Sequence, residues 1–311
     1  MSFTMDVRLE LSKAAVEKRC CAVAELQGAV LASSGLSFKG PGRYGLTLQT
    51  ESREILERYM AMIRKYFAVR ADVSAKTTDR LGGQTHYVLS PEAGDAKALI
   101  EAISLLDDSQ LFGMRSAPDA IGSDCCRRAF LRGAFLFCGS ISDPNKSYQL
   151  EFAQSSAALG ESICEIMRGY GLSARLSTRK SQNVCYVKDA EGVSDALALL
   201  GASIAVMTFE NVRIIKGLRN DVNRQVNCDK NNMDKVLNAS EKQLSMIKTI
   251  ERRLGMDGMP DTLREIAQLR IEYPDASLTD LGQMLTPPIG KSGVNARMRK
   301  LEMLAESLLN D

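Results

Sequence analysis

The chain has 311 residues, enough for two or three domains of ~100–200 residues and for a sizeable core. Apolar residues make up 45% and charged residues 25%, and these ordinary globular values exclude a disordered or fibrous protein. The longest uncharged apolar runs fall far short of the ~20 residues of a membrane helix, so we expect no membrane contact. The net charge of +2 is nearly neutral, and nucleic-acid binding therefore has to be argued from local charge.

The beginning of the chain argues against export. Asp6, Arg8 and Glu10 stand where a signal peptide carries its apolar segment. We therefore expect a cytoplasmic protein, and in that compartment disulfides are rare.

The eight cysteines comprise the pairs Cys20-Cys21 and Cys125-Cys126 and four single residues, with no C-x-x-C spacing. Adjacent cysteines do not easily converge on one tetrahedral ion, so we expect reduced thiols that act as small core residues, no metal site and no cofactor. His86 is the only histidine, and it follows a Gly-Gly turn at the start of a predicted strand. One histidine makes no catalytic constellation, so we assign no catalytic residue.

The chain contains an internal repeat. CCAVAELQGAVLASSGLSF, which begins at Cys20, aligns without gaps on CCRRAFLRGAFLFCGSISD, which begins at Cys125. Further along, YGLTLQT from Tyr44 matches YQLEFAQ from Tyr148. Self-similarity at a nearly constant spacing indicates two copies of one structural unit.

Each copy has the same predicted order of elements, αββαββα, with the second opening helix capped by Asp124. The helix that follows the first hairpin carries apolar residues at intervals of three and four, a pattern typical of packing onto a sheet. The elements are a helix at 17–33 and 124–138, a hairpin after each, a helix at 52–67 and 155–171, two strands within 69–90 and 173–188, and a short helix at 93–108 and 191–207.

This unit resembles the LAGLIDADG homing endonucleases, in which two such repeats pack their signature helices along a pseudo-two-fold axis. Residues 26–34 and 131–139 overlay the signature nonapeptide. Small residues at Gly28 and Gly133 suit the close helix packing that the resemblance implies. The endonucleases carry a metal-binding carboxylate at the eighth position, where this chain has Ser33 and Cys138. Without paired carboxylates a hard cation lacks its ligands, so the resemblance implies a degenerate, inactive domain.

A closer resemblance extends over nearly the whole chain. CCRRAFLRGAFLFCGSISDPNKSYQLEF, NDVNRQVNCDKNN and PPIGKSGVNARMRKLEMLAESL together resemble the WhiA family of bacterial regulators. The resemblance implies an inactive endonuclease-like domain followed by a DNA-binding helix-turn-helix domain. It also implies roles in sporulation, cell division and chromosome segregation.

Helical periodicity replaces the strand signals from about Thr208. Residues 209–228 form a predicted helix rich in basic and amide side chains, which suit phosphate contacts, and a solvated linker helix is the alternative. Residues 229–255 form a second predicted helix with a core-facing stripe that includes Val236 and Leu237. Candidates for additional DNA contacts are Arg213, Lys216, Arg219, Asn223, Arg224 and Asn227.

The last fifty residues predict three short helices. The first opens at Pro260-Asp261, the second follows Ser277, and the third is capped by Ser292 and runs through Leu309. A tight turn joins the second helix to the third, and the third begins with small and basic residues. This is the layout of a helix-turn-helix domain, with the third helix as its recognition helix.

The recognition helix carries the expected base and phosphate contacts. Ser292, Asn295 and Arg299 are suited to the major groove, where Asn295 can pair with adenine and Arg299 with guanine. Lys291, Arg297 and Lys300 are expected to contact phosphate.

The sequence therefore predicts an α+β protein with four segments: repeat 1 at 1–110, repeat 2 at 111–207, a helical linker at 208–256 and a helix-turn-helix domain at 257–311. We expect a non-enzymatic, sequence-specific transcriptional regulator that binds double-stranded DNA in the nucleoid. The repeats provide an internal pseudo-two-fold, so we expect a monomer or a weak dimer. A metal-dependent endonuclease with atypical acids and a protein-interaction scaffold are the alternatives. The repeat domain can add a DNA contact through Arg175, Arg179, Lys180 and Lys188, or bind a regulatory protein or small ligand.

Overall fold

The computed structural model describes residues 2–40, 43–77, 85–92, 94–106, 115, 118 and 121–310. The chain divides into two compact units, Met1–Lys216 and Gly217–Asp311. The first unit mixes helices and sheets and the second is helical, so the expected α+β class is confirmed. Among the described residues, no helix combines the length and the apolar character that crossing a bilayer requires.

The first repeat follows the predicted order, with one difference in its strands. The segment YGLTLQT contains two short strands that separate at Thr47, where a single strand was expected. As a result β1 pairs only with β2, while β3 joins a sheet of order β3-β5-β4. The expected Gly-Gly turn before His86 and the boundary at residue 110 lie outside the described residues. The elements are α2 (Arg19–Ala32), β1 (Leu36–Phe38), β2 (Tyr44–Leu46), β3 (Leu48–Thr50), α3 (Arg53–Phe67), β4 (Ala71–Thr77), β5 (Thr85–Pro91) and α4 (Asp95–Ala102).

The second repeat forms one antiparallel sheet of order β6-β7-β9-β8. Its opening helix has Ser123 as N-cap residue, so Asp124 is the first helical residue and the expected cap at Asp124 is wrong. The turn before β7 begins at Asp143, whose carbonyl accepts from the amide of Lys146 at 2.8 Å. The elements are α5 (Asp124–Cys138), β6 (Gly139–Ile141), β7 (Leu150–Gln154), α6 (Ala157–Gly169), β8 (Arg175–Arg179), β9 (Gln182–Val187) and α7 (Ala190–Leu200).

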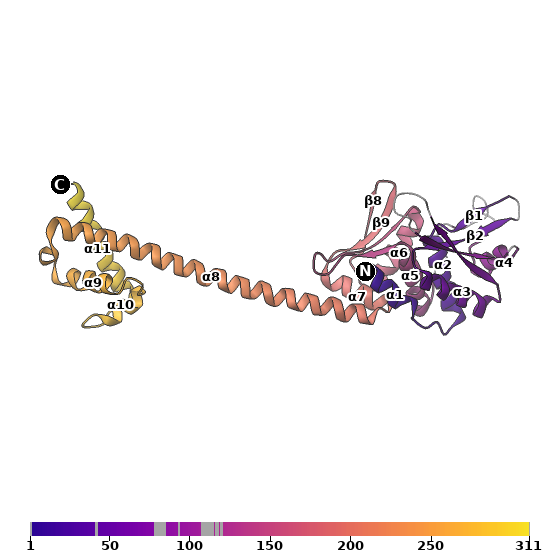
Figure 1. Cartoon of the computed structure of the whole chain (residues 1–311), viewed down its shortest axis with the longest axis horizontal. Helices are drawn as coiled ribbons and strands as arrows, with labels where there is room; N and C mark the ends of the chain where they lie inside the picture. The colour runs from indigo at the N-terminus through magenta and orange to yellow at the C-terminus, as the bar shows by residue number, and fades with distance from the viewer. Residues whose placement is uncertain are drawn as a thin grey trace. The chain divides into compact units, whose positions relative to one another are not determined.

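Helices α2 and α5 pack against each other at the centre of the first unit (Figure 1). A Cβ atom at Gly28 would overlap the carbonyl oxygen of Phe130, and a Cβ atom at Gly133 would overlap that of Glu25. The two repeats therefore use equivalent glycines to bring their helix backbones together. Larger side chains at these positions would force the helices apart.

A buried carboxylate lies inside this helix pair. Glu25 of α2 has no solvent exposure, and its Oε1 lies 2.7 Å from Nε of Arg58 in α3. Its Oε2 lies 3.5 Å from Nη1 of Arg132 in α5. A buried charge is stable only when it is paired, so this cluster joins α2, α3 and α5 electrostatically.

The helix α1 (Phe3–Ser12), which the sequence analysis did not predict, packs on the second repeat and on α3. Thr4 Oγ1 donates to the carbonyl of Ile141 and accepts from its amide, at 2.8 and 3.0 Å. The carboxylate of Glu10 accepts hydrogen bonds from the amides of Ile204 and Ala205, at 2.7 and 2.9 Å. Glu10 therefore satisfies the amides at the N-terminus of the next long helix, where a negative charge is favoured.

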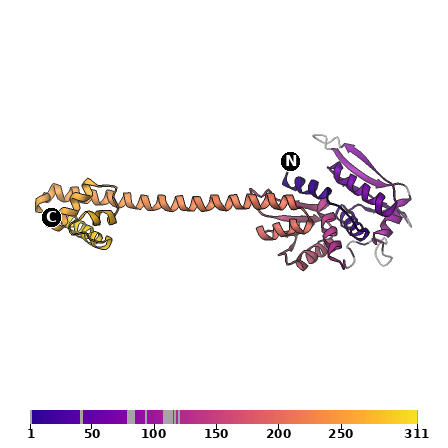
Figure 2. The same cartoon turned by 90° about the horizontal axis from the view of Figure 1, so that it is seen from below.

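A single helix, α8 (Ser203–Leu254), replaces the two helices expected at 209–228 and 229–255 (Figures 1 and 2). It begins before the expected boundary at Thr208, and the first compact unit ends within it at Lys216. The expected burial of Val236 and Leu237 is wrong, since each is 37% exposed. The end of α8 packs through Ile247 and Ile250 with a short 3-10 helix (Met256–Gly258), α9 (Asp261–Glu272), α10 (Leu278–Met284) and α11 (Lys291–Asn310).

Candidate nucleic-acid interface

The second unit has a single apolar core beneath α9, α10 and α11. The expected stripe of α11 is buried at Val294, Met298, Leu301 and Ala305, and Leu308 is partly buried. Ser277 caps α10 in a reciprocal capping box with Asp280, which gives this helix a defined start. One side of α11 therefore packs into the core, and the other side faces solvent.

The turn between α10 and α11 depends on a close backbone approach. The amide of Ile289 donates to the carbonyl of Gly282 at 2.9 Å, and a Cβ atom at Gly282 would overlap the carbonyl oxygen of Ile289. Only a glycine permits this approach without a shift of the backbone. The turn fixes where α11 begins, and α11 starts at Lys291, so Ser292 lies inside the first turn and the cap expected there is wrong.

The turn between α9 and α10 is held by a buried arginine. Arg270 is 2% exposed, and its Nη1 donates to the carbonyls of Pro274 and Ala276 at 3.2 and 2.7 Å. Ser240 of α8 donates to the same Pro274 carbonyl. Burial lowers the pKa of Arg270, but a guanidinium remains charged at neutral pH. Both connections of the three-helix arrangement are thus fixed by specific contacts.

The exposed face of α11 carries most of the side chains predicted to contact DNA. Asn295 and Arg299 are exposed and lie one helical turn apart, so they point to the same side. Among the described residues, neither has a hydrogen bond or ion pair within the protein. Lys291, Ser292 and Lys300 are exposed on the same helix.

Arg297 makes contacts within its own domain. Its Nη1 lies 3.5 Å from Oε2 of Glu265 and donates to the carbonyl of Thr262 at 3.3 Å. These contacts tie α11 to α9, and the phosphate contact expected of Arg297 stays a prediction.

The basic side chains of α8 also differ in whether they make contacts within the protein. Lys216 donates to the carbonyl of Pro144 at 3.2 Å and lies over the ring of Tyr148, and Arg213 pairs with Glu210 at 3.4 Å. Lys216 is therefore engaged within the first unit, and the phosphate contact expected of it stays a prediction. The other five candidates are exposed: Arg213, Arg219, Asn223, Arg224 and Asn227.

The positions that correspond to endonuclease acids lie at the C-terminal ends of α2 and α5. Ser33 is the C-cap residue of α2, and its hydroxyl donates to the carbonyl of Val30 at 3.1 Å. Burial raises the pKa of Cys138 to about 12, so its thiol is neutral at ordinary pH. Arg8 of α1 donates through Nη2 to the carbonyl of Gly139 at 2.6 Å. A guanidinium beside a neutral thiol disfavours the hard cation that the endonucleases bind here.

Comparison with known proteins gives three family models that match in succession. They are described as the WhiA N-terminal LAGLIDADG-like domain at residues 19–106, the WhiA LAGLIDADG-like domain at 127–219 and the WhiA C-terminal HTH domain at 222–305. A relative from Heliobacterium modesticaldum, named "Probable cell division protein WhiA", is 38% identical over 99% of this chain and 97% of its own length. The chain belongs to the WhiA family.

A second WhiA relative, from Alkaliphilus metalliredigens, is 38% identical over 98% of both chains and carries the same name. The crystal structure of full-length DUF199/WhiA from Thermatoga maritima matches over 99% of both chains, with a TM-score of 0.61 and 19% identity. The WhiA fold is therefore confirmed, with its two LAGLIDADG-like repeats and its helix-turn-helix domain.

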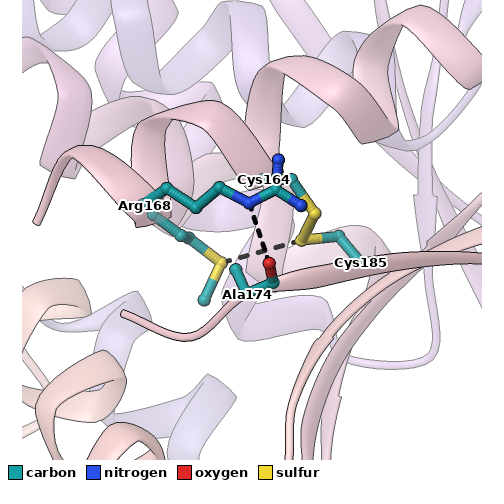
Figure 3. The surroundings of a disulfide bond; sticks show 5 residues. Cys164, Arg168, Ala174 and Cys185 are labelled. Carbon is teal, nitrogen blue, oxygen red and sulfur yellow. Dashed lines mark hydrogen bonds between the residues drawn. A yellow bond between two sulfur atoms is a disulfide. The ribbon is translucent and has the colours of Figure 1, made fainter. Parts of the chain in front are cut away.

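Two features of the cysteines in this WhiA chain were not predicted. Cys164 of α6 and Cys185 of β9 form a disulfide in the second repeat, beside the hydrogen bond from Arg168 to Ala174 (Figure 3). Both are buried, and the expectation that all cysteines are reduced is wrong for this pair.

The second missed feature is the convergence of the two cysteine pairs. The sulfur atoms of Cys20, Cys21, Cys125 and Cys126 all lie within 4.8 Å of one another. Each pair lies in the first turn of its helix, and the close packing of α2 and α5 brings the two turns together. The alignment of the pairs in the repeat was the available signal, since equivalent residues near a pseudo-two-fold axis approach each other.

Proposed function

We propose that this protein is a non-enzymatic, sequence-specific DNA-binding regulator of transcription, with α11 as the recognition helix. The observation that carries the proposal is the division of α11 into a buried face and an exposed face. The exposed face presents Asn295 and Arg299 without partners among the described residues. An unpaired amide and an unpaired guanidinium on one helical face suit adenine and guanine edges in the major groove.

We assign the sequence-independent part of the affinity to Lys291 and Lys300 on α11 and to Arg219 and Arg224 on α8. These exposed side chains suit phosphate oxygens, which position a protein on DNA without specifying sequence. Binding is expected to weaken as salt rises, with a log–log slope of about 0.9 per phosphate contact.

The test is genome-wide immunoprecipitation of the tagged full chain, beside an Asn295→Ala/Arg299→Ala variant. Discrete peaks that disappear in the variant support the proposal. The matched control is Asn238→Ala/Arg253→Ala, which removes the same two residue types from exposed positions on α8 and should keep the peaks. Peaks that persist in the first variant would show that α11 does not read the DNA.

The sheet of the second repeat is a candidate for an accessory DNA contact. Arg179 and Lys188 lie over the ring of Tyr186, at 5.6 and 5.0 Å from its centroid, and Arg175 is exposed. Glu151 lies 3.9 Å from Arg179 and reduces the local positive charge. If the sheet contacts DNA, Arg175→Ala/Lys188→Ala lowers the salt slope of binding. An unchanged slope would argue against a DNA contact of the sheet and would favour the sheet as a binding surface for a regulatory protein.

The two relatives are named as probable cell division proteins, and we extend a role in cell division to this protein, together with a cytoplasmic, nucleoid-associated location. Roles in sporulation and chromosome segregation belong to the same proposal. One chain contains both LAGLIDADG-like repeats, so we expect a monomer or weak dimer, which sedimentation at several concentrations measures.

A further inference from the structure

Four thiols meet at the N-terminal ends of the central helix pair, at the opposite end from Ser33 and Cys138. All four sulfur atoms lie within 4.8 Å of one another, and none of the four cysteines is in a disulfide. Within the described ranges this is the one group of three or more close His, Cys, Asp or Glu side chains with metal-ligand spacing. The group consists of Cys20 and Cys21 from α2 and Cys125 and Cys126 from α5.

The spacing fits a single tetrahedral metal ion. A zinc–thiolate bond of about 2.3 Å places the four sulfur atoms of a tetrahedral site about 3.8 Å apart. The observed upper limit of 4.8 Å therefore requires a contraction of about 1 Å at most. Side-chain rotation at the exposed Cys20 and the partly buried Cys21 and Cys125 can supply this movement.

The surroundings of the four cysteine sulfur atoms favour negative charge. Four thiolates with one divalent ion carry a net charge of −2, and each helix N-terminus is equivalent to roughly +0.5. Neither α2 nor α5 has a side-chain hydrogen bond at its N-cap, so both helix ends can interact with the thiolates. Lys18 precedes the first pair, and the hydroxyl of Ser123 lies 3.6 Å from the Cys125 sulfur. Such a hydroxyl can orient a ligand from outside the coordination sphere.

The site is also open to solvent on one side. A cavity of about 290 Å³ is lined by Lys18, Cys21, Cys125 and Arg128, among other residues. An ion can therefore reach the sulfur atoms without unfolding of the helix pair.

We propose that Cys20, Cys21, Cys125 and Cys126 bind one thiophilic divalent cation of the zinc class and that this ion clamps the two repeats together. Binding replaces four S–H bonds by four metal–sulfur bonds and releases four protons to solvent, with no change of oxidation state. Four protein ligands close the coordination sphere, so the site is structural and leaves no position for a substrate.

The test uses the full chain, purified with a reductant and stripped by a chelator, and zinc as the probe. Elemental analysis after addition of Zn²⁺ and removal of excess is expected to give one zinc per chain. Replacement by Co²⁺ is expected to give the visible absorption of a tetrahedral thiolate site. The Cys20→Ser/Cys125→Ser variant removes one ligand from each helix and is expected to bind zinc on the order of 100-fold more weakly or worse.

The matched control is Cys228→Ser, because Cys228 is a free, exposed cysteine on α8, away from the proposed ligands in sequence. It is expected to retain one zinc per chain. Circular dichroism of both variants without metal establishes that they are folded. The proposal is overturned if the reduced protein binds no zinc, if the double variant binds it as well as the parent chain, or if the four thiols prove to be paired in disulfides under reducing purification.

Discussion

Gln27 and Arg132 occupy equivalent positions in the two repeats and make the same kind of hydrogen bond. Nε2 of Gln27 donates to the carbonyl of Ile103, the C-cap residue of α4, at 2.7 Å. Nε of Arg132 donates to the carbonyl of Leu200, the last residue of α7, at 2.9 Å. Each central helix is thereby fastened to the last short helix of its own repeat. Arg132 alone also reaches Glu25, so the two copies have diverged in charge while keeping the same packing.

Replacing the charged carboxylate of Glu25 by a neutral group is expected to lower the stability of the first unit strongly. Glu25→Gln leaves the mostly buried guanidiniums of Arg58 and Arg132 without their counter-charge. We expect the free energy of unfolding of the first unit to fall by about 3–5 kcal/mol, measured by urea denaturation.

The control for Glu25 is Glu57→Gln, which breaks an ion pair of the same residue types between the exposed side chains of Arg53 and Glu57. Such a pair contributes about 0–1 kcal/mol. Equal losses in the two variants would contradict the assignment of a stabilising role to the buried cluster.

The contact between α2 and α5 predicts that added methyl groups are destabilising. Gly28→Ala or Gly133→Ala places a Cβ atom against a backbone carbonyl of the opposite helix, which only a helix shift can relieve. We expect losses of about 1–3 kcal/mol or more in thermal or urea unfolding. Gly217→Ala on α8 meets no atom within 4 Å and is expected to stabilise its helix by about 0.5–1 kcal/mol.

Substitutions of two arginines of α11 are expected to affect different properties, namely DNA binding at Arg299 and stability at Arg297. Arg299→Ala is expected to weaken specific binding by about 1–3 kcal/mol, roughly 5- to 150-fold, without a change in melting temperature, because Arg299 is exposed. Arg297→Ala removes the contacts to Glu265 and Thr262 and is expected to lower the melting temperature of the second unit. Titration of each variant with a bound DNA fragment, beside calorimetry, distinguishes the two. The reverse pattern would show that the faces of α11 have been misassigned.

Asp189 gives a stability contribution that depends on pH. Hydrogen bonds from the hydroxyl of Ser173 and from the amide of Gly192 lower the pKa of this N-cap carboxyl. Because the folded pKa lies below the unfolded value of about 3.9, the contribution is complete above that pH and is lost as the pH falls through the folded pKa.

Asp189→Ala is therefore expected to cost about 1 kcal/mol at pH 7 and progressively less below about pH 4. Urea unfolding across that range measures the difference. Asp195→Ala, at an exposed position on the same helix, should show little effect. A cost at Asp189 that does not change with pH would contradict the role of the charged carboxylate.

The two repeats could be predicted because the residue patterns that define their elements lie in short stretches of sequence and occur twice. The stripe of α3 and the small residues Gly28 and Gly133 are each visible in a short stretch of sequence. The buried stripe of α11 and the capping box at Ser277 were predictable for the same reason.

The features that were missed depend on contacts between distant segments. The role of Arg297 depends on where α9 crosses α11, and the cysteine cluster depends on how the first turns of α2 and α5 meet. Neither is visible in the spacing of residues along one helix. The exposure of Val236 has the same origin, because an apolar residue is buried only where a partner surface covers it.

The hydrogen bonds from Ile204 and Ala205 to Glu10 join residues 194 and 195 positions apart in the chain. At a synthesis rate of about 5–20 residues per second, roughly 10–40 s separate the emergence of Glu10 from that of its partners. During this interval the carboxylate of Glu10 lacks the two amides that it binds in the folded unit. The order of synthesis therefore makes the docking of α1 against the start of α8 a late event in folding, after both repeats have left the ribosome.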